Sequence, residues 1–114
     1  MSLELGKSRA EVVSRVLETL QEIFGPSFPA VLRFHLRKWM GEGGMETLWD
    51  RPKEVFEALS RHRTGEEGAV WLIYTWITSV KEGEEGRRLA MELVEAMKRG
   101  DVEAVRSILV LALF

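Results

Sequence analysis

The sequence predicts an all-α protein, a single-domain bundle of about six helices that ends in an αα-hairpin. Apolar residues recur at spacings of three and four along most of the chain, and helix start and stop signals bracket these segments. No segment shows the alternation of a strand. With 114 residues, the chain has the size of one domain. We therefore expect one domain over residues 1–114, with a main bundle over 8–80 and a helical hairpin over 84–114.

The first helix is predicted from Ser8 to Phe24. Its start reads Ser-Arg-Ala-Glu, a capping box in which Ser8 and Glu11 each satisfy a free backbone N–H group. Gly25 can adopt a positive φ and Pro26 prevents continuation, so the helix is expected to end there. One apolar stripe connects the two ends: Val12, Val13, Val16, Leu17, Leu20, Ile23 and Phe24.

Two further helices are predicted from serine, proline and aspartate signals. Ser27 is expected to cap the second helix, with Pro29 in its first turn, and Gly41 is expected to end it. Asp50 is expected to cap the third helix, with Pro52 early in it. The inward faces are predicted to carry Phe28, Val31, Leu32, His35, Leu36 and Trp39 on the second helix, and Val55, Phe56 and Leu59 on the third.

The segment from Ala69 to Ile77 is apolar nearly all the way round, as expected of a central helix or a buried strand. The preceding Thr64-Gly65-Glu66-Glu67 reads as a second capping box and favours the helix. A linker-like stretch over 81–86 then leads to the C-terminal hairpin, where Gly100 is expected to end one helix and Asp101 to cap the next.

The composition excludes several classes of protein. The chain has no cysteine, which removes disulfides, thiolate metal sites and cysteine nucleophiles. It has no stretch of about 20 uncharged residues and no apolar leader, so we expect neither a membrane span nor a signal peptide but a cytoplasmic protein. Abundant Glu and Arg with one glutamine and no asparagine indicate a thermophile.

Gly41-Glu42-Gly43-Gly44 raises the question of a phosphate-binding loop. Such a loop follows a strand, precedes a helix and is completed by a lysine. Here the glycines follow a predicted helix, the second residue is acidic and no Gly-Lys-Ser/Thr follows. We therefore interpret them as a helix stop and a flexible turn.

Catalytic and metal-binding signals are missing. His35 and His62 are the only histidines, and neither has a second ligand at the spacing of a helical metal site. His35 is interpreted as a core histidine. The acidic pairs Glu66–Glu67 and Glu84–Glu85 are explained by the favourable field at a helix N-terminus, and no Gly-x-Ser-x-Gly elbow occurs. We predict no enzyme, no cofactor and no metal.

Two basic clusters form a candidate anion patch: Arg33, Arg37 and Lys38 on one helix, and Arg61, His62 and Arg63 on the next. If these helices are neighbours, the clusters could merge into one surface for a phosphate, a nucleic acid or an acidic partner. The alternative is a solvated face of a charge-rich protein. The net charge of -2 disfavours nonspecific nucleic-acid binding.

Four tryptophans require an explanation. Trp39, Trp71 and Trp76 lie on or beside apolar stripes and are predicted to pack in the core, and a ligand-sensing pocket lined by all three is an alternative. Trp49 falls in a predicted loop, where it either covers the core or anchors a partner.

The chain ends with seven consecutive apolar residues, Ile108 to Phe114, which leave no face for water on a helix. They either enter the chain's own core or meet another chain, of which a twofold homodimer is the commonest form. The candidate partner interface is therefore Trp49, Ile108, Leu109, Leu111, Leu113 and Phe114.

A Pro-x-x-Phe-x-x-Ala-Leu-like helix, here from Pro52 to Leu59, precedes a glycine-marked turn into a long apolar helix. The positions of this pattern, over roughly residues 12 to 80, are Gly25, Ser27, Ala30, His35, Leu36, Pro52–Leu59, Gly68, Ala69, Ile73 and Ile77. The pattern resembles the Nitrosopumilus output domain, a small archaeal helical family. The charged stretch from Arg61 to Thr64 departs from the family, which tends to have an apolar turn there. The resemblance implies a module acting in signalling and supplies no site residues.

The sequence thus favours a non-enzymatic interaction or signalling-output module that forms a homodimer through its C-terminal helix. Two alternatives stay open: a small nucleic-acid-binding regulator that uses the basic clusters, and a ligand-sensing domain with a tryptophan-lined pocket.

Overall fold

The computed structural model describes residues 6–61 and 65–114. Within these ranges the chain forms seven helices and no strand, packed as one compact globule, which confirms the all-α prediction. The helix beyond the expected six is the five-residue α3, which the sequence analysis did not predict. The helices are α1 (Arg9–Phe24), α2 (Phe28–Met40), α3 (Glu46–Asp50), α4 (Pro52–Ser60), α5 (Gly65–Val80), α6 (Gly83–Arg99) and α7 (Val102–Leu113).

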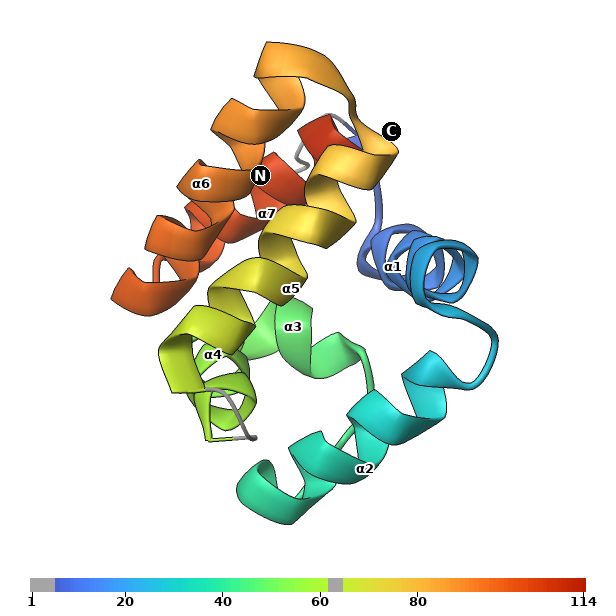
Figure 1. The fold of residues 1–114 in the computed structure, drawn as a ribbon, viewed down its shortest axis with the longest axis vertical. Helices are drawn as coiled ribbons and strands as arrows, with labels where there is room; N and C mark the ends of the chain where they lie inside the picture. The colour runs from blue at the N-terminus through green and yellow to red at the C-terminus, as the bar shows by residue number, and fades with distance from the viewer. Residues whose placement is uncertain (1–5, 62–64) are drawn as a thin grey trace.

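Helix α5 is the centre of the fold. It crosses the middle of Figure 1 with α6 and α7 on one side and α1 on the other, and it packs against all three and against α4. Its buried face carries Ala69, Ile73, Trp76 and Ile77. The apolar segment is therefore a central helix, as the preceding capping signal indicated, although Thr64 of that capping box lies outside the described residues.

A buried hydrogen bond joins α5 to α1. The Trp76 Nε1–H group donates to Thr19 Oγ1 over 2.8 Å, and the Thr19 hydroxyl donates in turn to the backbone carbonyl oxygens of Arg15 and Val16. Thr19 is fully buried, and water is therefore excluded from its hydroxyl group. The indole N–H group has this partner in the core, which removes the penalty for burying an unpaired donor.

The capping box of α1 is present as predicted. The Glu11 backbone N–H donates to Ser8 Oγ over 3.1 Å, and the Ser8 backbone N–H donates to Glu11 Oε1 over 2.8 Å. This backbone hydrogen bond lowers the pKa of Glu11 from its ordinary value. At the other end, the Gly25 N–H donates to the carbonyl oxygen of Gln21 and closes the helix.

Of two other predicted caps, one is in place and one is wrong. Ser27 is the N-cap residue of α2 as predicted, although its side chain makes no capping bond. Asp50 is the last residue of α3 and does not cap α4, whose N-cap is Arg51. Asp50 instead pairs with Arg9 across the start of α1, with 2.6 Å between carboxylate oxygen and guanidinium nitrogen. The local sequence pattern predicted that Asp50 would cap the following helix, whereas its carboxylate binds Arg9, a residue distant in the sequence.

The C-terminal hairpin forms as predicted. Gly100 has φ of 73° and ends α6, and Asp101 accepts a hydrogen bond from the Ala104 backbone N–H over 3.2 Å at the start of α7. At the far end, Arg15 Nε donates to the Leu113 carbonyl oxygen over 2.9 Å. That bond satisfies one of the backbone carbonyls that the end of a helix leaves without a partner.

Across the part of the chain that the structure describes, no helix combines the length and the apolar character needed to cross a membrane.

Replacing Thr19 by valine should destabilise the protein. The Thr19→Val variant keeps the side-chain volume but leaves the Trp76 N–H buried without an acceptor, which costs about 1–3 kcal/mol. Urea denaturation followed by far-UV circular dichroism measures this free energy of unfolding. Thr78→Val is the matched control, because the Thr78 hydroxyl bonds only to the Tyr74 carbonyl of its own helix. Equal effects of the two substitutions would contradict the role assigned to the Thr19–Trp76 bond.

The Arg9–Asp50 pair should be detectable by titration. The hydrogen bond from Arg9 lowers the pKa of Asp50 from its ordinary value. Because the folded-state pKa is depressed, the pair stabilises the fold above the unfolded pKa, and this stabilisation is lost as pH falls through the folded value. Arg9→Gln should move the pKa of Asp50 upward in an NMR titration, whereas Arg88→Gln on α6 should leave it unchanged. An unaltered Asp50 in the Arg9 variant would rule the pair out.

Candidate interaction surface

Among the residues that the structure describes, seven large apolar side chains are exposed. Four are on α2 and α5, and three are on α6 and at the C-terminal end of α7. Neighbouring exposed apolar residues mark interaction sites more often than isolated ones do. The residues are Val31, Phe34, Trp39 and Trp71 in the first group, and Met91, Leu111 and Phe114 in the second.

Aromatic rings connect α5 to α2 across the end of α1. The ring of Phe24, the last residue of α1, lies 6.5 Å from that of Trp71 and 4.8 Å from that of Phe28, the first residue of α2. Val31 and Phe34 continue the series along α2 at spacings of three, so they share one face of that helix. We call Trp71, Phe24, Phe28, Val31 and Phe34 the aromatic band.

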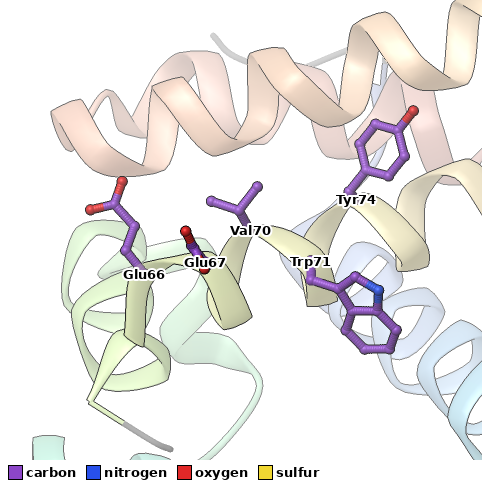
Figure 2. Close-up of a pocket in the computed structure, with 5 residues that line it drawn as sticks. All are labelled: Glu66, Glu67, Val70, Trp71 and Tyr74. Atoms are coloured by element: carbon purple, nitrogen blue, oxygen red, sulfur yellow. The ribbon is translucent and has the colours of Figure 1, made fainter. Parts of the chain in front are cut away.

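An open hollow of about 380 Å³ lies along α5 next to Trp71. Its lining residues occur at helical spacing along α5, and Figure 2 shows Tyr74 and Val70 directed to one side of that helix and Trp71 to the other. The hollow is mainly apolar, with carboxylates at the N-terminal end of the helix. Its lining consists of Glu66, Glu67, Val70, Trp71 and Tyr74.

Charged side chains flank the aromatic band on α5 and on α2. On α5, Glu66 pairs with Lys98 of α6 over 2.8 Å, and this hydrogen bond raises the pKa of Lys98, whereas Glu67 pairs with no described residue. On α2, Arg37 and Lys38 are exposed three and four residues after Phe34. Neither of these cations has an ion pair within residues 6–61 and 65–114.

The structure brings part of the two predicted basic clusters together. Lys38 Nζ lies 5.5 Å and the Arg61 guanidinium 5.4 Å from the centroid of the Trp39 ring, because α2 packs against α4. Arg33 and Arg37 are exposed further along α2, and His62 and Arg63 lie outside the described residues.

A hollow of about 270 Å³ beside Trp39 holds carboxylates as well as cations. Arg51 there pairs with Glu42 over 2.5 Å and also with Glu54, so its charge is compensated. Glu57 adds a further carboxylate to the lining. This mixture of charges does not favour an anion over a cation in the hollow itself.

The candidate interface at the C-terminus is largely internal. Ile108, Leu109 and Leu113 are buried in the chain's own core, and so is Trp49, which is 6% exposed on α3. A buried side chain cannot contact a partner unless the core opens, so we reassign these four residues to the core. Arg106 lies over the Trp49 ring at 4.8 Å, which further covers it. Only Leu111 and Phe114 remain on the surface, and Lys7 lies over the Phe114 ring at 4.7 Å.

The predicted core positions of Trp39 and Trp71 are wrong, since they are 42% and 62% exposed. Val31 was also expected to face inward and is 50% exposed. Of the three tryptophans predicted to pack in the core, Trp76 alone does so. Trp39 and Trp71 line separate hollows, so the three tryptophans do not form the single pocket considered from the sequence.

Phe34 was not identified from the sequence, although it is 67% exposed. The sequence nevertheless contained a signal for an exposed apolar residue on α2. Helix α2 carries more large apolar residues than one inner face can hold, which indicates a second apolar face.

The remaining candidates have local roles. His35 is half-buried on α2 and makes an edge-to-face contact with Phe34, with ring centroids 5.7 Å apart. Glu66–Glu67 and Glu84–Glu85 occupy the first turns of α5 and α6, as expected from the field at helix N-termini. No group of three or more potential metal ligands occurs in the described ranges.

The glycine-rich stretch is a helix stop followed by a close backbone contact. Gly41 has φ of 85° and its N–H donates to the Arg37 carbonyl oxygen over 2.9 Å, which ends α2 as predicted. A Cβ atom on Gly43 would lie 2.3 Å from the Arg33 carbonyl oxygen. Gly43 therefore allows the chain to turn back against α2 before α3 begins.

Comparison with protein-family models, curated proteins and solved structures finds no match to this chain.

Gly43→Ala should destabilise the fold, because its Cβ would collide with backbone that cannot move alone. Overpacking of this kind costs about 1–3 kcal/mol. Gly44→Ala is the matched control, since the added Cβ there meets only the flexible end of the Glu46 side chain. Thermal and urea denaturation of both variants measure the difference. Equal stability of the two variants would contradict the close approach at Gly43.

Proposed function

We propose that this chain is a non-enzymatic helical interaction module that binds a polypeptide through the aromatic band and the adjoining hollow on α5. The observation that carries the proposal is the 62% exposure of Trp71, on the central helix and between two groups of apolar side chains. Tryptophan is among the residues that most often dominate the binding energy of an interface.

Covering the aromatic band with a partner would be energetically favourable. Burying one large apolar side chain is worth about 1.5–3 kcal/mol, and the aromatic band offers several neighbouring ones. Trp71 also stands on a helix that α1, α4, α6 and α7 hold in place. A partner would therefore meet a preorganised surface and lose little free energy in ordering it.

The side chains at the hollow suit binding better than catalysis. Among the described residues, its polar groups are two carboxylates, a phenol and the Trp71 indole, and Glu66 is already paired with Lys98. No serine, threonine or histidine of residues 6–61 and 65–114 lines the hollow to form a nucleophile–base pair with them. The signalling role implied by the resemblance to the Nitrosopumilus output domain agrees with this proposal, since such a module must contact another polypeptide.

One observation supports the alternative of nucleic-acid binding. Lys38 and Arg61 share the Trp39 ring, and cations beside an exposed aromatic ring are the groups that bind single strands. Against it stand the net charge of -2 and the carboxylates of Glu54 and Glu57 in the adjoining hollow. We therefore favour a polypeptide partner.

Trp71→Glu should abolish most peptide binding. Amphipathic helical peptides selected from a randomised library on the wild-type chain should bind Trp71→Glu at least about tenfold more weakly, since loss of an aromatic anchor costs about 2 kcal/mol or more. Fluorescence anisotropy with labelled peptides measures the affinity, and circular dichroism checks the fold.

Met91→Glu is the matched control, because Met91 is also an exposed apolar residue but lies on α6, outside the aromatic band. It should leave peptide affinity unchanged. A library that yields no binders, or binders indifferent to the Trp71 substitution, would disprove the proposed function.

A further inference from the structure

We propose that the polypeptide partner places a basic side chain, arginine or lysine, in the hollow on α5, where the cation pairs with Glu67 and lies against the ring of Trp71. This inference rests on the proposed function and adds the chemical class of the group that the hollow binds.

The geometry of α5 brings a carboxylate and an indole to the same hollow. Glu67 and Trp71 are four residues apart, so their side chains are neighbours on one face of the helix. Figure 2 shows Trp71 directed to one side of α5 and Val70 and Tyr74 to the other. By helical spacing of about 100° per residue, Glu67 projects between these two sides. A group bound in the hollow is therefore within reach of both the carboxylate and the indole.

The hollow offers a negative charge and no cation. Among the described residues, its charged lining groups are Glu66 and Glu67. Glu66 is bound to Lys98 over 2.8 Å, so these two charges compensate each other. Glu67 is exposed and makes no ion pair within residues 6–61 and 65–114. The charge of Glu67 is therefore available to a ligand.

The ring of Trp71 is also available to a cation. Two cations of the chain lie beside the Trp39 ring and one lies over the Trp49 ring, whereas none from the described residues lies over Trp71. Trp76 is buried in the core. Tryptophan is the aromatic side chain that attracts cations most strongly. Trp71 is thus an exposed indole without the cation that the chain itself supplies to Trp39 and Trp49.

A partner that covers Trp71 also covers Glu67. Because the two side chains are one helical turn apart, a polypeptide seated on the indole removes water from the neighbouring carboxylate. An ionised carboxylate that loses water without a compensating group is strongly disfavoured. A basic side chain supplies the opposite charge and hydrogen-bond donors, and its apolar stem can lie against the rings. A wholly apolar segment would leave the carboxylate uncompensated, and an acidic one would be repelled.

The hollow beside Trp39 is less suitable for such a cation. Arg51 and Arg61 line it, and Lys38 also lies beside the Trp39 ring. A basic side chain from a partner would meet like charges there. The hollow on α5 has no cation among its described lining residues, so it is the better place for the basic group.

Binding of selected peptides tests the inference. Helical peptides selected on the wild-type chain from a randomised library should carry an arginine or lysine on which their affinity depends. Glu67→Gln should weaken these peptides at least about fivefold, because the interface removes this charge pair from water. Replacing the basic residue of the peptide by glutamine should weaken binding similarly and remove the effect of Glu67→Gln. Fluorescence anisotropy measures the affinities, and circular dichroism checks the fold.

Glu67→Lys should reverse the preference, so that a peptide with glutamate in place of its basic residue binds this variant more tightly than it binds the wild-type chain. Glu103→Gln is the matched control, because Glu103 is also an exposed carboxylate in the first turn of a helix but lies on α7. It should leave peptide affinity unchanged. Equal weakening by Glu67→Gln and Glu103→Gln would reduce the preference to net charge and overturn the inference.

Peptides whose binding depends on Trp71 but does not respond to Glu67→Gln would overturn the inference and leave the proposed function standing. The same holds for Trp71-dependent peptides that carry no basic residue. Binding that is indifferent to Trp71→Glu would disprove both.

Discussion

The fold depends on covering α5, a sixteen-residue helix whose segment from Ala69 to Ile77 is apolar nearly all the way round. Four helices, α1, α4, α6 and α7, pack against it, and they come from both ends of the sequence. The Thr19–Trp76 hydrogen bond belongs to the same arrangement, because the indole can be buried only where its N–H group finds an acceptor. The positions of the remaining helices depend largely on the apolar surfaces that they cover.

The covering of α5 is incomplete, and the candidate site follows from this. Trp71 lies on the side that no helix hides, and the nearby rings of Phe24 and Phe28 extend its apolar surface to α2. The proposed interaction surface is therefore the uncovered part of the same helix that organises the core. Its rigidity has the same origin, since the packing of the fold fixes the position of Trp71.

Some charged side chains near this surface are paired within the chain and others are not. Internal ion pairs hold Glu66, Arg51 and Asp50, and each of these joins segments of the chain. Glu67 and Lys38 have no ion pair within the described residues.

The sequence by itself determined six of the seven described helices and several of their ends, because a capping box or a helix-ending glycine involves hydrogen bonds between residues at most four or five positions apart. Ser8, Gly25, Gly41, Gly100 and Asp101 were predicted for this reason. Helix α3 was missed, since five residues are too few to show a periodic stripe. Only the tertiary structure decided that Asp50 binds Arg9, that Lys38 and Arg61 share the Trp39 ring, and that Trp71 is exposed while Trp49 is buried. Helical spacing tells which residues share a face, but whether a face is buried depends on which distant helix packs against it.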